Sequence, residues 1–154
     1  MPPHTMGESA ASIVVTIDGS EESRRALQLA SRLATALGQH LVILTVVPPP
    51  PVYPVDTVPI LVDPPQVTEA YRKSLEAASQ EAKRAGIVGS EAVILEGPVV
   101  DTIVQFLRER QPTMAVIGAR GLSAGARLFL GSVSDGVVHH APCPVLVVRN
   151  PSKP

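Results

Sequence analysis

The fold is indicated most directly by residues 114–140, MAVIGARGLSAGARLFLGSVSDGVVHH. The stretch begins with a short apolar run, Met114–Gly118, which is typical of a buried strand. A glycine-rich segment follows, and Ser132 then opens a helical pattern that continues to about His140. We predict Ser132 as the N-cap of that helix, with Asp135 completing a capping-box-like pair. The stretch therefore predicts a strand, a glycine-rich loop and a helix in direct succession.

Outward from this stretch, strand-like and helix-like patterns alternate along the chain. Short aliphatic runs predict further strands over Ser12–Ile17, Leu41–Val47, Glu91–Leu95 and Val145–Val148. Apolar residues at helical spacing predict further helices over Glu21–Leu37, Val67–Ala85 and Pro98–Leu107. Ser20 is the predicted N-cap of the first of these helices. Strands that alternate with helices predict an α/β domain with a parallel sheet and helices on both of its faces.

A proline-rich segment interrupts this pattern after the second predicted strand. Eight of the chain's 16 prolines lie between Pro48 and Pro65. Proline removes a backbone donor, and it breaks regular helices and central strands. We therefore predict a long surface loop over residues 48–66. It lies inside a single domain, residues 11–150, that follows a flexible tail of residues 1–10.

The composition disfavours several classes of partner. The chain has 13 basic and 14 acidic residues, so no broad basic surface attracts nucleic acid. One cysteine, Cys143, rules out an internal disulfide framework. The N-terminal residues have no apolar run of signal-peptide length, and no run reaches the roughly 18 apolar residues of a membrane span. We expect a cytoplasmic protein that binds neither nucleic acid nor membranes.

The glycine-rich segment between Gly118 and Ser132 has the composition of a phosphate-binding turn. Glycine lets the backbone approach a ligand closely, and a helix N-terminus attracts anions. In open parallel sheets, ligands bind beyond the carboxyl ends of the strands, where the strand order reverses. The alternative is that the glycines only shape a turn. Arg120 and Arg127 either pair with phosphate or remain solvated.

The spacing Gly118-x2-Gly121-x9-Gly131-Ser132 resembles the nucleotide-binding signature of the universal stress proteins, in the subgroup that binds ATP. The resemblance runs from about Ile13 to Arg149. It includes the strand and acidic turn at Val14–Ser20 and the C-terminal signature, which is formed by Leu130–Ser134 and Ala141–Arg149.

The resemblance implies a five-stranded parallel sheet in the order 3-2-1-4-5, a Rossmann-like fold of the adenine nucleotide alpha hydrolase type. It implies ATP, with or without Mg²⁺, as the ligand. Asp18 would lie beside the adenosine, and the backbone of Val46 would meet the adenine edge. The glycines would let the chain approach the ribose and phosphates, which residues 131–134 would hold. The full set of implied contact residues is Ile17, Asp18, Val46, Gly118, Arg120, Gly121, Gly131, Ser132, Val133 and Ser134.

Three functions are compatible with these residues. The leading hypothesis is a nucleotide-dependent regulatory or stress-response protein that hydrolyses ATP slowly or not at all. The sequence contains no P-loop motif, no obvious catalytic base and no clustered carboxylates for Mg²⁺. The alternatives are a slow ATPase or phosphotransferase, with Asp18 as its base, and a dimeric adaptor without nucleotide. A purely structural role for Asp18, in an Asx turn or a helix cap, also stays open.

The cysteine and the two adjacent histidines near the C-terminus indicate no separate reactive or metal site. Cys143 lies between two prolines and is interpreted as a small hydrophobe. His139 and His140 are adjacent, so they do not form an i,i+4 metal pair.

The last predicted strand indicates that two copies of the chain assemble. In the order 3-2-1-4-5, Val145–Arg149 forms an apolar edge with unpaired amides and carbonyls. We expect a two-fold homodimer in which this strand meets its copy.

Overall fold

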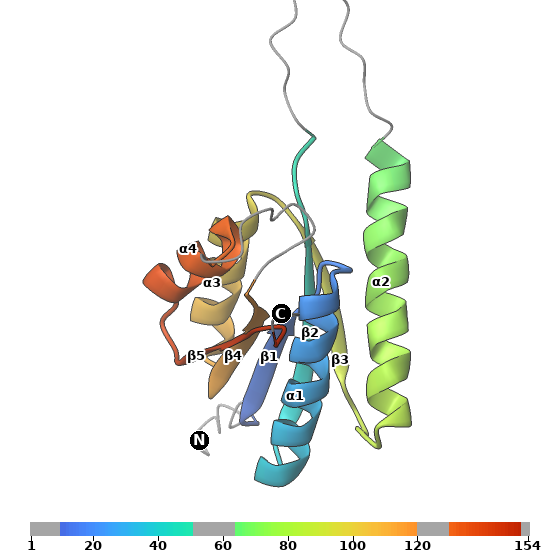
Figure 1. The fold of residues 1–154 in the computed structure, drawn as a ribbon, viewed down its shortest axis with the longest axis vertical. Helices are drawn as coiled ribbons and strands as arrows, with labels where there is room; N and C mark the ends of the chain where they lie inside the picture. The colour runs from blue at the N-terminus through green and yellow to red at the C-terminus, as the bar shows by residue number, and fades with distance from the viewer. Residues whose placement is uncertain (1–9, 51–63, 120–129, 152–154) are drawn as a thin grey trace, which may run out of the picture.

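The computed structural model describes residues 10–50, 64–119 and 130–151 of the 154-residue chain. Strands and helices alternate throughout these residues (Figure 1). The strands are β1 (Ser12–Thr16), β2 (His40–Val47), β3 (Glu91–Glu96), β4 (Met114–Gly118) and β5 (Val145–Val148). The helices are α1 (Glu21–Leu37), α2 (Pro64–Arg84), α3 (Val99–Arg110) and α4 (Ser132–His140). All strand pairs are parallel and the order is β3-β2-β1-β4-β5, which confirms the predicted fold class.

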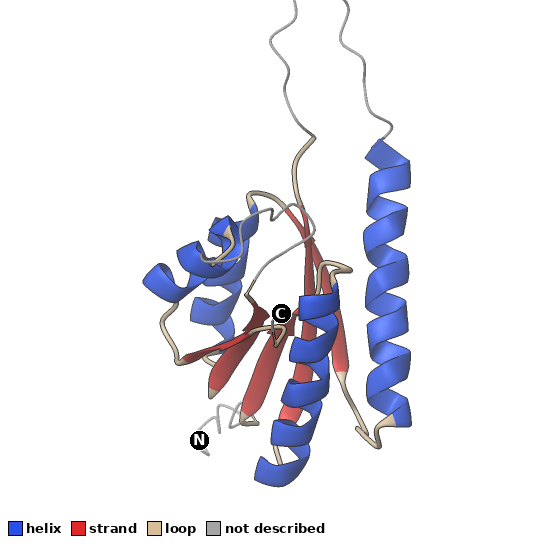
Figure 2. Ribbon diagram, in the orientation of Figure 1, coloured by secondary structure: helices blue, strands red, loops and turns tan. Residues whose placement is uncertain are grey.

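The sheet is the middle layer of three (Figure 2). Side chains of β1 alternate between the two faces. Ile13 and Val15 pack in one buried cluster with α1 and α2, while Val14 packs in a second cluster with α3 and α4. The helices that connect β1 to β3 therefore cover one face, and those that connect β3 to β5 cover the other. This division follows from right-handed crossovers that reverse direction between β1 and β4.

The central strand β1 is shorter than its neighbour β2. Pairing of β1 with β2 ends at Thr16 and Leu44, and its pairing with β4 ends at Val15 and Val116. Strand β2 continues alongside β3 as far as Val47. We refer to the region beyond the end of β1, at the point where the strand order reverses, as the crevice, because ligands bind at this position in open α/β sheets.

Three helix starts differ from the sequence-based expectation. Helix α3 begins at Val99, one residue after the predicted start at Pro98, which is its N-cap. The N-cap of α4 is Gly131 and not Ser132, and none of the described side chains caps this helix. The N–H group of Gly131 donates to the Ala119 carbonyl at 2.7 Å, which holds Gly131 extended and leaves Ser132 as the first helical residue.

Helix α2 begins at Pro64, so the predicted loop over residues 48–66 extends too far. Proline is tolerated in a first helical turn because the N–H groups there have no intrahelical acceptor. Residues 51–63 of that loop and residues 1–9 of the predicted tail lie outside the described part of the chain. Within the described part, no helix combines the length and the apolar character needed to cross a membrane.

Candidate functional site

The end of β2 presents backbone groups that β1 does not reach. Consecutive residues of a strand direct their N–H and C=O groups to opposite sides. The carbonyl of Leu44 accepts from Ile17 on the β1 side at 2.8 Å, whereas that of Val47 accepts from Gly97 on the β3 side at 3.0 Å. Val46 alternates in step with Leu44, so its N–H and C=O groups face the β1 side.

Val46 has no strand neighbour on that side. Strand β1 has ended, and within the described residues no hydrogen bond joins the backbone of Val46 to Ile17, Asp18 or Gly19. The Ile17 carbonyl instead accepts from the hydroxyl of Thr45 at 3.0 Å. One donor and one acceptor of the same residue, Val46, are therefore directed into the crevice.

Asp18 follows β1 and forms an Asx turn. Its Oδ1 accepts from the N–H group of Ser20 at 2.9 Å, and its own N–H group donates to the Ser23 hydroxyl at 3.4 Å. Ser20 is the N-cap of α1, as predicted, and accepts from the N–H group of Ser23. These bonds hold the half-buried Asp18 carboxylate at the end of β1. Asp18 therefore has the structural role that the sequence left open, an Asx turn, and this turn orients its side chain at the crevice.

Tyr71 of α2 is a residue of this region that the sequence reasoning missed. Burial raises the pKa of the Tyr71 phenol above its ordinary value, and the negative charge of Asp18 raises it further. Helix α2 lies against the β1–α1 turn, since a Cβ on Gly19 would be 3.1 Å from the hydroxyl oxygen of Ser74. No local pattern in the sequence relates residue 71 to residue 18.

Gly118 ends β4 against the first turn of α1. A Cβ on Gly118 would lie 2.8 Å from the backbone carbonyl carbon of Glu22 and 2.9 Å from the Ser23 nitrogen. Real Cβ atoms do not approach other atoms so closely, so only glycine lets α1 pack at this distance. The packing of α1 thus requires a glycine here, and the ligand role that the family resemblance implies for Gly118 stays a prediction.

The first turn of α4 has backbone donors without an intrahelical acceptor. These are the N–H groups of Ser132, Val133 and Ser134, and no side chain in the described part of the chain caps them. Aligned peptide dipoles give this end partial positive charge. The Ser134 hydroxyl does not face the helix end, because it is buried and donates to the Ala119 carbonyl at 2.7 Å. Ser132 is exposed.

Ala119 joins the end of β4 to the start of α4. Its carbonyl accepts from Gly131 and Ser134, and its N–H group donates to Val148 at 2.8 Å. The start of α4 is thereby fixed beside the end of β4. The predicted residues that the structure brings to the carboxyl end of the sheet are Ile17, Asp18, Val46, Gly118, Gly131, Ser132, Val133 and Ser134.

Two of the predicted contact residues, Arg120 and Gly121, lie outside the described residues, as does Arg127. In the ranges that are described, no group of three or more His, Cys, Asp or Glu residues could hold a metal ion.

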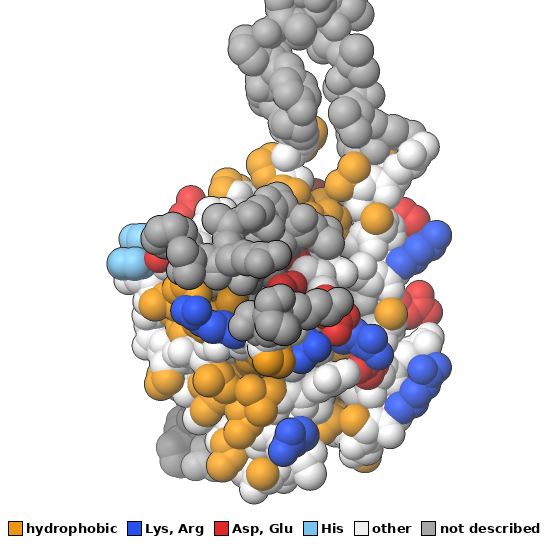
Figure 3. All heavy atoms as spheres, viewed as in Figure 1, with side chains coloured by type: hydrophobic (Ala, Val, Ile, Leu, Met, Phe, Trp, Pro, Cys, Tyr) orange, Lys and Arg blue, Asp and Glu red, His pale blue; other side chains and the backbone are white. Residues whose placement is uncertain are grey.

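A separate groove of about 500 Å³ lies between α1 and α2. Its floor includes Leu27 and Ala78, and Arg24 and Glu81 face each other across it with a 3.2 Å ion pair. In Figure 3, acidic and basic side chains lie side by side over these two helices. The groove reaches Ile17 and Gly19 at the β1–α1 turn.

Comparison with known proteins finds relatives over most of the chain. The profile of the universal stress protein family matches residues 11–149. A Thermus aquaticus relative, described as the universal stress protein in the QAH/OAS sulfhydrylase 3′ region, is 35% identical over 141 residues, which are 89% of this chain and 97% of the relative.

Solved structures of the family share the fold. A universal stress protein in complex with cAMP is 30% identical, with a TM-score of 0.69 over 91% of this chain and 97% of that one. An Archaeoglobus fulgidus protein in complex with dAMP is 22% identical, with a TM-score of 0.64 over 90% and 97% of the two chains. An Arabidopsis thaliana protein with AMP bound is also 22% identical, with a TM-score of 0.62 over 92% and 93%. The chain belongs to the universal stress protein family.

Proposed function

We propose that this chain binds ATP in the crevice at the end of β1 and acts as a nucleotide-dependent regulatory protein in a stress response. The observation that carries this proposal is that, within the described residues, the backbone N–H and C=O groups of Val46 have no neighbouring strand to pair with on the β1 side. Adenine presents a hydrogen-bond acceptor and an amino donor side by side on one edge. The N–H and C=O groups of Val46 match that pair, and no described residue occupies them.

The residues on either side of Val46 in the crevice suit the ribose and the phosphates of the nucleotide. The carboxylate of Asp18 lies at the end of β1, where an acidic side chain can accept from a ribose hydroxyl. The uncapped first turn of α4 supplies N–H groups and a positive dipole end for phosphate. Solved family members in complex with cAMP, dAMP and AMP support an adenine nucleotide as the ligand class.

We expect slow turnover or none. The candidate base, Asp18, has one carboxylate oxygen committed to the Ser20 N–H group. In the proposed pose it lies at the adenosine end, away from the phosphates that α4 holds. When Mg²⁺ accompanies ATP, phosphate oxygens and water would supply most of its ligands.

Isothermal titration with ATP, AMP, cAMP and GTP tests the proposal, together with mass spectrometry of nucleotide retained through a gentle purification. We expect adenine nucleotides to bind and GTP to bind more weakly, because its base reverses the donor and acceptor that Val46 meets. Gly131→Val should crowd the phosphate approach and weaken ATP binding. Ala92→Val, at an exposed position of β3, is the matched control. Equal affinity of the Gly131→Val and Ala92→Val proteins for ATP would show that the phosphates do not bind at the start of α4.

Single-turnover assays with labelled ATP separate this function from an enzymatic one. Release of phosphate on the timescale of binding would show that the protein is an ATPase and would overturn the proposed regulatory function. We place the protein in the cytoplasm, since the chain's single cysteine fits a reducing compartment.

We also propose a homodimer formed through residues Val145–Arg149. Strand β5 is an edge of the sheet, and its Leu146 side chain is 36% exposed. Figure 3 shows apolar side chains gathered over this part of the molecule. The carbonyls of Pro144 and Val148 accept from β4, so the alternating N–H group of Val147 points away from β4 and toward a second strand.

A further inference from the structure

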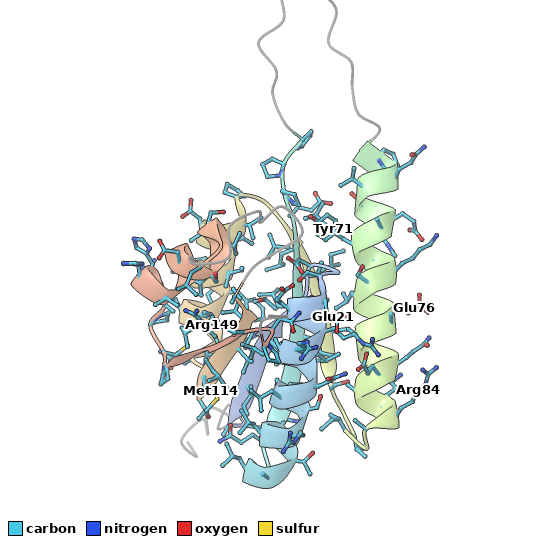
Figure 4. All side chains as sticks on the ribbon, in the orientation of Figure 1. Glu21, Tyr71, Glu76, Arg84, Met114 and Arg149 are labelled. Atoms are coloured by element: carbon cyan, nitrogen blue, oxygen red, sulfur yellow. The ribbon has the colours of Figure 1, made fainter. Side chains whose placement is uncertain are left out.

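Tyr71 lies where the buried face of α2 runs past the ends of the strands. This face continues through Leu75, Ala78 and Ala82, which are 7%, 6% and 0% exposed and belong to the cluster beneath α1 and α2. Tyr71 has the same spacing, one turn nearer to the N-terminus of the helix, but is only half-buried. Figure 4 shows its side chain directed from α2 toward the upper end of β2. The ring is therefore only partly covered by the core below it.

The β1–α1 turn lies against this part of α2. A Cβ on Gly19 would be 3.1 Å from the hydroxyl oxygen of Ser74, which is one helical turn after Tyr71. Asp18 precedes Gly19, and its charge acts on the Tyr71 phenol. Among the described residues, the phenol oxygen has no hydrogen-bond partner. Tyr71 thus combines a partly exposed ring with an unpartnered hydroxyl, next to Asp18.

Few other aromatic rings are present in the molecule. The chain contains two Tyr, two Phe and no Trp. Phe106 packs on the opposite face of the sheet with the α3 and α4 cluster. Tyr53 and Phe129 lie outside the described residues. Tyr71 is therefore the aromatic ring that the described structure offers on the α1 and α2 side of the crevice.

We propose that Tyr71 is a nucleotide-binding residue whose ring forms the α2 wall of the crevice and packs on the adenosine beside Asp18. This proposal rests on the proposed function and adds a residue to its adenosine end. Aromatic rings stack on bases with little preference among them. Tyr71 therefore contributes affinity for the nucleoside part of the ligand, while the choice of adenine depends on Val46.

A single-tyrosine reporter tests the contact directly. In a Tyr53→Phe protein, Tyr71 is the only tyrosine, and the chain has no tryptophan. Its emission is excited at the red edge of the tyrosine band, where adenine absorbs little. We expect saturating AMP to quench this emission and ribose 5-phosphate at the same concentration to leave it unchanged.

The second arm measures binding energy. Tyr71→Leu should weaken adenosine, AMP and ATP binding by one common factor of at least about fivefold, as expected when a ring leaves a base. Tyr71→Phe keeps the ring and should stay within about threefold of the wild type, at the lower end of the effect of one neutral hydrogen bond, because stacking needs only the ring. Glu76→Ala, on the outward face of α2 (Figure 4), is the control and should bind as the wild type does. Melting curves check that each variant is folded.

The outcomes separate this inference from the proposed function. If the wild-type protein binds no adenine nucleotide, the proposed function fails, and the role of Tyr71 fails with it. If the wild type binds, but Tyr71→Leu has unchanged affinity or the reporter emission is unaffected, only the role of Tyr71 is overturned. If Tyr71→Leu does not fold, the reporter decides alone, and quenching by AMP supports the contact.

Discussion

The backbone carbonyl carbon of Glu22, in the first turn of α1, lies 2.8 Å from where a Cβ on Gly118 would be. The end of β4 and the start of α1 are thus in direct backbone contact, with no room for a side chain. This contact brings the β1–α1 turn, and Asp18 with it, close to the β4 edge of the crevice.

Gly118→Ala should therefore destabilise the fold. Overpacking of a tight contact costs roughly 1–3 kcal/mol, because the helix must move away from the strand. Urea denaturation of the variant and the wild type measures the difference. If unfolding free energy is unchanged while ATP affinity falls, Gly118 serves the ligand and not the packing of α1.

Two serines in the first turn of α4 should separate binding from stability. Ser132 is exposed at the phosphate end, so Ser132→Ala should weaken ATP binding by roughly two- to tenfold and leave stability unchanged. Ser134 is buried and donates to the Ala119 carbonyl, so Ser134→Ala should lower the free energy of unfolding by about 1 kcal/mol. Titration calorimetry and urea denaturation of both variants check the two effects. Loss of ATP binding in a stable Ser134→Ala protein would assign that hydroxyl to the ligand.

The Tyr71 phenol should titrate above its ordinary pKa, and Asp18→Asn should lower its pKa part of the way. Asparagine retains an oxygen for the Ser20 N–H group but removes the charge, while burial, the larger cause, remains. Tyrosinate absorbance in the Tyr53→Phe background measures both values. An unshifted titration after Asp18→Asn would mean that the two groups do not interact.

The same shift predicts how stability depends on pH. The folded protein holds the Tyr71 proton more tightly than the unfolded chain does, because its pKa is raised. The resulting stabilisation is complete below the unfolded pKa of about 10 and is lost as the pH rises through the folded value. Tyr71→Phe, which cannot ionise, should remove this component of alkaline destabilisation.

Val147→Pro should convert the proposed dimer into a folded monomer. The N–H group of Val147 points away from β4, so proline there removes a donor from the outer edge and leaves the β4 ladder intact. Leu146→Pro is the contrasting variant, since it removes an inward donor and should destabilise the protomer. Light scattering gives the mass, and circular dichroism reports the fold. A monomeric wild type at micromolar concentration, or a Val147→Pro protein that stays dimeric, would refute this interface.

Cys143 should react slowly with thiol reagents. Burial raises the pKa of its thiol, and a hydrogen bond with the Ala115 backbone only partly opposes this effect. At neutral pH the thiolate is the reactive form, so a raised pKa lowers the rate. We expect reaction with an aromatic disulfide reagent to be slower in the native protein than in urea. Native reactivity equal to that of free cysteine would contradict the burial.

The order of elements could be predicted from the sequence because the signals that specify it are local. The runs around Val15 and Ile43 are apolar throughout, and the stripe from Ala26 to Ala34 repeats at helical spacing. These patterns correctly indicate buried strands and amphipathic helices. The Ser20 cap follows from a side chain that bonds three residues away. The family spacing around Gly131 predicts a site at the carboxyl end of the sheet, and this stays a prediction.

What only the tertiary structure decided depends on residues far apart in the chain. Gly118 is constrained by Glu22, Ser134 is turned inward by Ala119, and Gly131 is held by the same carbonyl, which moves the start of α4 by one residue. The charge of Asp18 acts on Tyr71 only because α2 packs beside the β1–α1 turn. The open face of Val46 likewise exists because β1 ends before β2 does, and relative strand length is a property of the assembled sheet. Local periodicity determined the elements of this protein, and contacts between distant segments determined which of their groups remain free to bind a ligand.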